Sequence, residues 1–121
     1  MIGYVTIGTN DLARAGKFYD EVLGMLGAKR VMESDRYICW GAGEHSPLLM
    51  VTKPFDGKPA TVGNGVMVAF SAGSEDKIKA MYDKARALGA ADEGAPGNRG
   101  GTFYGAYARD PDGNKICFFM M

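Results

Sequence analysis

Residues 1–27, MIGYVTIGTNDLARAGKFYDEVLGMLG, decide the fold because their pattern returns later in the chain. Residues 2–7 are rich in β-branched side chains and are followed by Gly-Thr-Asn, which predicts a strand that runs into a turn. Asp11 is suited to cap a helix, because its carboxylate can accept free backbone N–H groups of the first turn. Apolar residues then recur every three or four positions, which predicts an amphipathic helix. They are Ala15, Phe18, Tyr19, Val22 and Met25.

A second copy of this pattern begins near residue 65. Residues 66–70 predict a strand, residues 71–73 a turn, and Ser74 a helix cap. The caps Asp11 and Ser74 lie 63 positions apart, and so do the dipeptides Tyr-Asp at 19–20 and 82–83. The apolar stripe of the second helix keeps the same offset; it consists of Ile78, Met81, Tyr82, Ala85 and Leu88. A constant offset over a strand, a cap and a helix indicates a duplicated unit of about half the chain.

The remainder of each copy predicts three further strands. In the first half they are residues 28–33, 36–41 and 48–52, where aromatic and β-branched residues are frequent. In the second half, residues 103–109 and 115–121 predict strands, whereas residues 90–94 predict a weak one. Each half is then a βαβββ module, in which one helix covers one face of a four-stranded sheet.

Two segments of the chain predict loops. Residues 53–64 contain two prolines and several turn-forming residues, which indicates an exposed connector between the modules. Residues 95–102 are polar and glycine-rich, but they do not lead from a strand into a helix as phosphate-binding loops do. The backbone freedom of glycine favours a mobile flap there. A chain of 121 residues suits one α+β domain, with module 1 at about 1–52, the connector at 53–64 and module 2 at about 65–121.

Composition excludes several classes of partner. Lys plus Arg and Asp plus Glu number 14 each, so the formal net charge is zero, whereas nucleic acids and anionic membranes attract a positive surface. No apolar run approaches the roughly 20 residues of a membrane helix, and no secretory signal pattern opens the sequence. Cys39 and Cys117 lack the dense spacing of a disulfide framework. We therefore expect a cytoplasmic protein.

Together, these motifs resemble the vicinal oxygen chelate superfamily, which includes glyoxalase I, bleomycin-resistance proteins and extradiol dioxygenases. The resemblance rests on Asp-Leu-Ala-Arg at 11–14, Phe-Tyr-Asp-Glu-Val-Leu-Gly at 18–24, Gly-Asn-Gly at 63–65 and, most specifically, Arg-Asp-Pro-Asp-Gly-Asn-Lys-Ile at 109–116. It covers the whole chain. It implies mixed sheets whose two modules close a barrel-like cleft, with the helices outside, and family precedent implies a homodimer.

The resemblance also implies where a metal would lie. Metal-using members place His on the first strand, Glu on the fourth, His on the fifth and Glu on the eighth. The matching positions of this sequence are Tyr4, Leu48, Met67 and Cys117. None is the expected imidazole or carboxylate ligand, and the only histidine, His45, lies in a predicted loop. We therefore expect no metal and no other cofactor.

The strand period predicts which side chains line the cleft. If Tyr4 faces it, alternate residues of the first and last strands give an apolar, aromatic and thioether lining that suits a flat organic molecule. Arg99 and Arg109 are candidates for holding a carboxylate, although solvated surface residues are the simpler interpretation. The candidate ligand-binding residues are Tyr4, Thr6, Trp40, Leu48, Met50, Met67, Tyr104, Cys117 and Phe119.

Three functions remain open from the sequence. The first is a metal-free binding protein of the bleomycin-resistance type, which takes up a small aromatic or amphipathic molecule. The second is a glyoxalase-like lyase or isomerase with a divergent site, in which Tyr4 acts as a catalytic acid or base; a tyrosine with its ordinary pKa of about 10 needs strong perturbation for that role. The third is a structural module whose side chains fill the cleft. A Cys117–His45 nucleophile pair has no support, because nothing in the sequence brings the two together.

Overall fold

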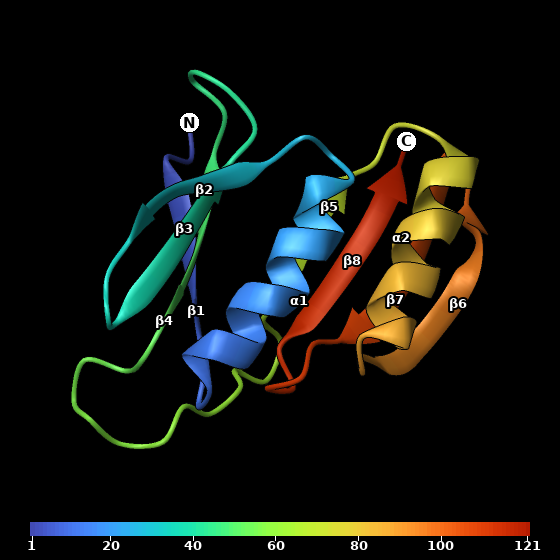
Figure 1. Cartoon of the computed structure of the whole chain (residues 1–121). Coiled ribbons are helices and arrows are strands. Elements are labelled where there is room, and N and C mark those ends of the chain that lie inside the picture. The colour runs from blue at the N-terminus through green and yellow to red at the C-terminus, as the bar shows by residue number, and fades with distance from the viewer. The chain divides into compact units, whose positions relative to one another are not determined.

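The computed structural model describes the whole chain, Met1–Met121, and contains eight strands and two helices (Figure 1). In chain order the elements are β1 (Tyr4–Gly8), α1 (Leu12–Gly24), β2 (Lys29–Glu33), β3 (Tyr37–Gly41), β4 (Leu48–Thr52), β5 (Val68–Ser71), α2 (Glu75–Ala87), β6 (Ala91–Gly100), β7 (Phe103–Arg109) and β8 (Lys115–Met120). Neither helix is long and apolar enough to cross a bilayer.

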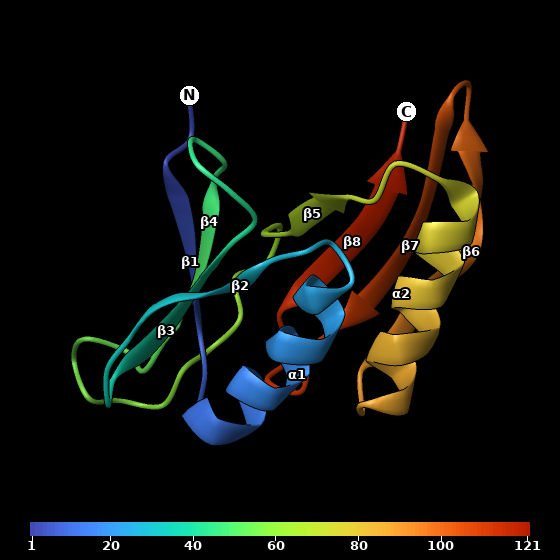
Figure 2. The same cartoon turned by 45° about the horizontal axis from the view of Figure 1, so that its top comes forward.

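The chain divides into two compact units, Met1–Val62 and Gly63–Met121, that repeat one topology. The strand order is β1-β4-β3-β2 in the first sheet and β5-β8-β7-β6 in the second. In each unit the first strand pairs in parallel with the last, and the other pairs are antiparallel. The two sheets are separate and mixed, and neither closes into a barrel (Figure 2). The predicted α+β fold of two βαβββ modules is confirmed.

The helix caps repeat as the sequence predicts. The carboxylate of Asp11 accepts a hydrogen bond from the backbone N–H of Arg14 at 3.0 Å, and the hydroxyl of Ser74 accepts one from Lys77 at 3.1 Å. Both helices contain 13 residues. Because each cap satisfies a free N–H of the first turn, it fixes where its helix begins.

In the first unit, α1 packs on one face of the sheet through a nearly continuous apolar stripe. Its buried residues include Phe18, Tyr19 and Val22. Trp40 of β3 lies beneath the helix, 5.7 Å from the ring of Tyr19, and its indole N–H donates to the carboxylate of Asp20 at 2.9 Å. This face of the sheet is therefore the core of the first unit.

In the second unit, α2 covers the corresponding face with fewer buried side chains, namely Ile78, Met81 and Ala85. On the sheet beneath it, the small residues Ala106 and Ala108 lie opposite Phe118 and Ile116 of β8, and all four are fully buried. The large residues of this core therefore come from the helix and from β8, and the small ones from β7.

The largest difference between the predicted and the observed secondary structure lies at residues 90–102. The sequence predicts a weak strand at 90–94 and a mobile flap at 95–102, but β6 runs from Ala91 to Gly100. It pairs with β7 through three register shifts, and only residues 101–102 turn. The flap prediction is wrong because backbone pairing with β7 outweighs the low strand propensity of glycine, which instead allows the irregular register. Smaller differences are that β1 begins at Tyr4 and β5 at Val68.

The segment predicted as a connector is largely part of the first unit. The side-chain amide of Asn10 donates to the carbonyl of Ala60 at 3.1 Å and accepts from its N–H at 2.6 Å. These two hydrogen bonds hold residues 53–60 against the turn between β1 and α1. Phe55, within this segment, is 93% exposed.

The most specific sequence motif, at residues 110–114, forms the turn between β7 and β8. The buried carboxylate of Asp110 accepts hydrogen bonds from the N–H groups of Asp112 and Asn114, both at 2.9 Å, and from the Asn114 side chain at 3.0 Å. Gly113 has a φ of 90°, which favours glycine at that place. The motif therefore fixes how β8 enters the sheet.

Candidate functional site

The sheet of the first unit has a second face, opposite α1, which we call the first open face. On it, Tyr4 lies beside Leu48, and Thr6 beside Met50, in the parallel pairing of β1 with β4. Cys39 of β3 lies opposite Met50. Tyr4 is 61% exposed, and Val31 and Met32 at the edge of this sheet are also exposed. The chain thus presents aromatic, aliphatic and thioether side chains on one sheet face.

The second open face is the face of the other sheet that α2 does not cover. Cys117 lies at its centre, between Ala69 of β5 and Tyr107 of β7. Two residues further along β8, Phe119 stacks on Phe103 with a centroid distance of 5.6 Å and nearly parallel rings. Met67 precedes β5 and is 42% exposed. This face also combines aromatic and sulfur-containing side chains.

Two of the candidate residues lie on helix-covered faces instead. Trp40 is 1% exposed and is held between α1 and the first sheet. Tyr104 lies opposite Met120, in register with the buried residues Ala106 and Phe118, which places it on the α2 side of the second sheet. Tyr107, which was not among the candidate residues, takes the open-face position beside Cys117.

The sequence offered Arg99 as a candidate for holding a carboxylate, but sequence reasoning missed that Arg99 and Lys115 meet at the ring of Tyr107 on the second open face. The guanidinium carbon of Arg99 lies 5.4 Å, and the ammonium nitrogen of Lys115 5.5 Å, from the ring centroid of Tyr107. The signal available in the sequence was the alternation of β8, which places Lys115 on the same face as Cys117. Arg109 is engaged differently, since its side chain donates to the carboxylate of Glu93 and to the carbonyl of Gly113.

These cations influence the thiol at the centre of the face. Burial raises the pKa of Cys117, while the positive charges of Arg99 and Lys115 act in the opposite direction. Burial also raises the pKa of Cys39 on the first open face. Both cysteines are free, and a protonated, buried thiol behaves as a small apolar group.

The residues at the superfamily's metal-ligand positions do not fit a metal of the usual kind. Leu48 offers no donor atom, the thioether of Met67 is a weak and soft one, and the pKa of Cys117 is raised. Divalent metals in such sites require imidazole nitrogen or carboxylate oxygen. No three His, Cys, Asp or Glu side chains of the chain lie together as a metal site would require. His45 lies in the exposed loop between β3 and β4.

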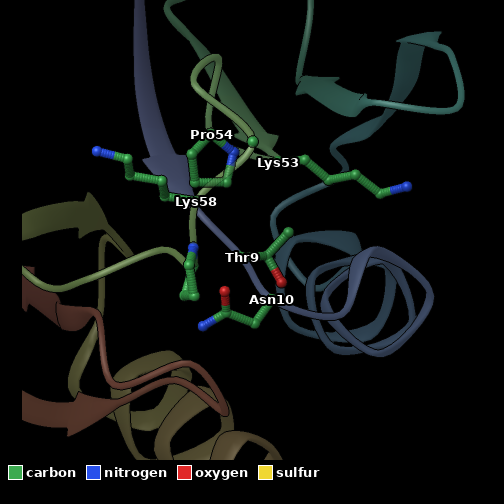
Figure 3. A pocket seen from close by; sticks show the side chains of 7 residues that line it. Thr9, Asn10, Lys53, Pro54 and Lys58 are labelled. Carbon is green, nitrogen blue, oxygen red and sulfur yellow. The ribbon is translucent and has the colours of Figure 1, made fainter.

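A separate hollow of about 310 Å³ lies within the first unit, where residues 53–59 approach the start of α1 (Figure 3). Its two lysines, Lys53 and Lys58, extend to opposite sides, so their ammonium groups do not converge on it. Thr9 uses its hydroxyl locally, donating to the carbonyl of Asp11 at 3.0 Å. The lining consists of Thr9, Asn10, Lys53, Pro54, Gly57, Lys58 and Pro59. The hollow results from the packing of the 53–60 segment and lies apart from the predicted site residues.

The sequence profile of the Glyoxalase/Bleomycin resistance protein/Dioxygenase superfamily matches residues 1–118. The chain belongs to this superfamily. A comparison with curated proteins finds no match.

Among solved structures of this superfamily, a glyoxalase/bleomycin resistance protein from Albidiferax ferrireducens is similar to this chain with 38% identity and a TM-score of 0.90. The alignment covers 98% of this chain and 97% of that one. A putative glyoxalase from Bacillus halodurans has 21% identity and a TM-score of 0.81, with 98% and 94% covered. A lactoylglutathione lyase from Agrobacterium tumefaciens has 20% identity and a TM-score of 0.72, with 98% and 92% covered. The last two show a common fold.

Proposed function

We propose that the protein binds a small aromatic or amphipathic molecule through the open faces of its sheets, without a metal ion, as a binding protein of the bleomycin-resistance type. The observation that carries the proposal is the first open face, where Tyr4 stands 61% exposed beside Leu48 on a sheet whose other face is fully used by α1. Exposed aromatic and aliphatic residues gathered on one face mark a binding surface in a soluble protein.

The second open face supports the same function. Phe119 and the neighbouring Tyr107 are partly exposed and offer ring faces on which planar organic molecules stack well, whereas the thiol of the adjacent Cys117 is buried. In this proposal Tyr4, Thr6, Leu48 and Met50 contribute from the first module, and Met67, Cys117 and Phe119 from the second. Trp40 and Tyr104 lie on the helix-covered faces of their sheets, where they contribute to packing and do not contact the ligand.

The binding function is tested with N-phenyl-1-naphthylamine, a neutral fluorophore that brightens in apolar surroundings. We expect saturable binding to the wild-type protein and a loss of affinity of about fivefold or more in Tyr4→Ala, since removing a stacking ring from a binding surface costs about 1 kcal/mol. Phe55→Ala is the matched control because Phe55 is an exposed aromatic residue outside both open faces. Equal losses in both variants would contradict a site on the first open face.

The metal-free character is tested separately by elemental analysis of the purified protein. We expect zinc, nickel, manganese and iron each well below one equivalent per chain. A stoichiometric metal, together with turnover of methylglyoxal and glutathione that Tyr4→Phe abolishes, would replace the binding function by the glyoxalase-like lyase alternative.

We further propose that the protein is a cytoplasmic homodimer. The edge strand β2 is exposed along its whole length, and an exposed edge with neighbouring apolar residues favours association with a second chain. In a reducing compartment Cys39 and Cys117 remain thiols. Light scattering should give twice the chain mass of 12.9 kDa, whereas a value equal to the chain mass would exclude the dimer.

A further inference from the structure

The second open face changes its chemical character along β8. Lys115, Cys117 and Phe119 alternate onto it, so it runs from a cation through a thiol to an aromatic ring. At a rise of about 3.3 Å per residue, the Cα atoms of Lys115 and Phe119 are separated by about 13 Å. A face of that length with one charged end and one apolar end matches a small amphipathic molecule.

The charged end holds two cations without an acidic partner. Arg99 and Lys115 both lie against the ring of Tyr107, and neither forms an ion pair with a carboxylate. Arg99 uses its guanidinium locally, donating to the carbonyl of Ala95. Glu93 pairs with Arg109 and Asp92 accepts from Tyr82 at 2.7 Å, and these bonds lower the pKa of both carboxyl groups. The charges of Arg99 and Lys115 add to the lowering for Asp92 and Glu93 respectively, but neither cation forms a direct ion pair, so an incoming anion can still contact them.

Two glycines of β6 leave space for the guanidinium group of Arg99. A Cβ atom on Gly94 would lie 2.9 Å from the Tyr107 ring and 3.2 Å from the Arg99 guanidinium. A Cβ on Gly97 would lie 3.2 Å from another nitrogen of the same guanidinium. The missing side chains therefore leave the room in which Arg99 lies flat against the strand. The glycine-rich segment that predicts a flap thus has a different structural role, because it positions a cation.

The opposite end of the face is aromatic. Phe103 and Phe119 stack with an interplanar angle of 4°, and Phe103 lies over Gly105, where a Cβ would meet its ring at 2.8 Å. Cys117, between the two ends, carries no charge at neutral pH because burial raises its pKa. The face therefore separates its positive end from its apolar end.

We propose that the ligand is an amphipathic organic anion, whose acidic group binds at the end of the face that carries Arg99 and Lys115 and whose apolar body extends toward the Phe103–Phe119 pair. This inference rests on the proposed binding function and specifies its ligand class. A guanidinium and an ammonium group each suit the oxygens of a carboxylate, sulfonate or phosphate group. The aromatic pair suits an aromatic ring or a short acyl chain.

The test compares two fluorophores that differ by one acidic group. 8-Anilinonaphthalene-1-sulfonate carries a sulfonate on the same ring framework that N-phenyl-1-naphthylamine presents without charge. We expect the sulfonate to bind the wild-type protein about tenfold more tightly, as expected for one or two charge-assisted hydrogen bonds. Raising KCl from about 0.05 to about 0.5 M should weaken binding of the sulfonate and leave the neutral probe unaffected.

Variants assign this preference to the two cations. Arg99→Gln and Lys115→Met should each lower the affinity for the sulfonate by about threefold to tenfold and leave the affinity for the neutral probe unchanged. Lys79→Met is the matched control, since it removes one positive charge from the exposed side of α2. Circular dichroism spectra should be the same for all three variants and the wild type.

The outcomes separate this inference from the function on which it rests. If neither probe binds saturably, the binding function and the anion preference both fail. If both probes bind equally and the two variants match the Lys79→Met control, the binding function stands and the anion preference is wrong. A preference for the sulfonate that all three variants reduce equally would show attraction by net charge alone and would also overturn the assignment to Arg99 and Lys115.

Discussion

The two units share one topology, but their cores place large side chains at different positions. The strand register makes Trp40 of β3 equivalent to Ala108 of β7, because each lies in the row of paired residues that begins at repeat-related positions of β1 and β5. At one helix position the relation is reversed, since Ala15 of α1 corresponds to Ile78 of α2, whereas Phe18 and Val22 of α1 correspond to the smaller Met81 and Ala85. The repeat therefore keeps the topology while the residues that fill each core differ.

The two helices also differ in what stabilises them. α1 has no acidic residue in its first turn and no basic residue in its last, but it buries six residues. α2 buries three, and it places Glu75 and Asp76 in the first turn and Lys84 and Arg86 in the last, where they favour the helix dipole. The first unit therefore depends more on packing, and the second more on local helix stability.

The largest expected effect comes from removing the bulk of the first core. Trp40→Ala should lower the free energy of unfolding by about 3–5 kcal/mol, because it leaves a cavity under α1 and removes the hydrogen bond to Asp20. Far-UV circular dichroism in urea measures the change, since Trp40 is the only tryptophan and its fluorescence is lost with it.

Two further substitutions sharpen this comparison of the cores. Ile78→Ala, which removes bulk from the helix side of the second unit, should cost about 2–5 kcal/mol. Trp40→Phe keeps a ring in place and should cost less than Trp40→Ala. Equal losses of stability in Trp40→Ala and Ala108→Gly would contradict the description of Trp40 as a large core residue of the first unit and Ala108 as its small equivalent in the second.

The next largest effect should come from the hairpin that joins β7 to β8. Asp110→Ala should cost about 1–3 kcal/mol, since it leaves the partly buried N–H groups of Asp112 and Asn114 without their acceptor. The β3–β4 loop of the first unit is the natural contrast. There, Ser46→Ala removes one exposed hydrogen bond to Gly43 and should change stability by no more than about 0.5 kcal/mol. Thermal unfolding would contradict this contrast if both substitutions shifted the midpoint equally.

A smaller, pH-dependent effect distinguishes the aspartates of the repeated Tyr-Asp dipeptide. Arg30 donates two hydrogen bonds to Asp20 at 2.8 Å and, with help from Trp40, lowers its pKa. A lowered folded-state pKa adds stability above the unfolded-state pKa, near 4, and that stability is lost as the pH falls through the folded-state value. Because the pair is partly exposed, Asp20→Asn should cost about 1 kcal/mol or less at pH 7.

In urea titrations, the difference between the wild type and Asp20→Asn should stay constant from pH 6 to about 5 and then shrink toward the acid limit of folding. Asp83, the repeat-related residue, forms no ion pair, and Asp83→Asn serves as the control. A difference for Asp20→Asn that stayed constant over this range would show that the ion pair adds nothing to stability.

The sequence predicted correctly those elements that are determined by residues close to one another along the chain. The two caps, the two helices, β4 and the 110–114 turn follow from side chains that act within a few positions. The location of Trp40 did not follow, because β3 is apolar at consecutive positions and its alternation cannot be read. Tyr104 and Tyr107 were ambiguous for the same reason. The strand character of β6 and the meeting of Arg99 with Lys115 depend on register with β7 and β8, which no local pattern specifies.

The smallest expected effect again contrasts the two hairpins. His45, in the β3–β4 loop, has a φ of 63°, whereas the β7–β8 turn places Gly113 at its positive φ of 90°. A side chain in the left-handed region is strained, but glycine also gains entropy in the unfolded chain, so His45→Gly should raise the free energy of unfolding by only about 0.5 kcal/mol. Gly113→Ala should lower it by about 1 kcal/mol or more, because alanine must adopt the same region. Urea unfolding of both variants compares them directly, and a loss of stability in His45→Gly would mean that contacts of the imidazole outweigh the backbone strain of that loop.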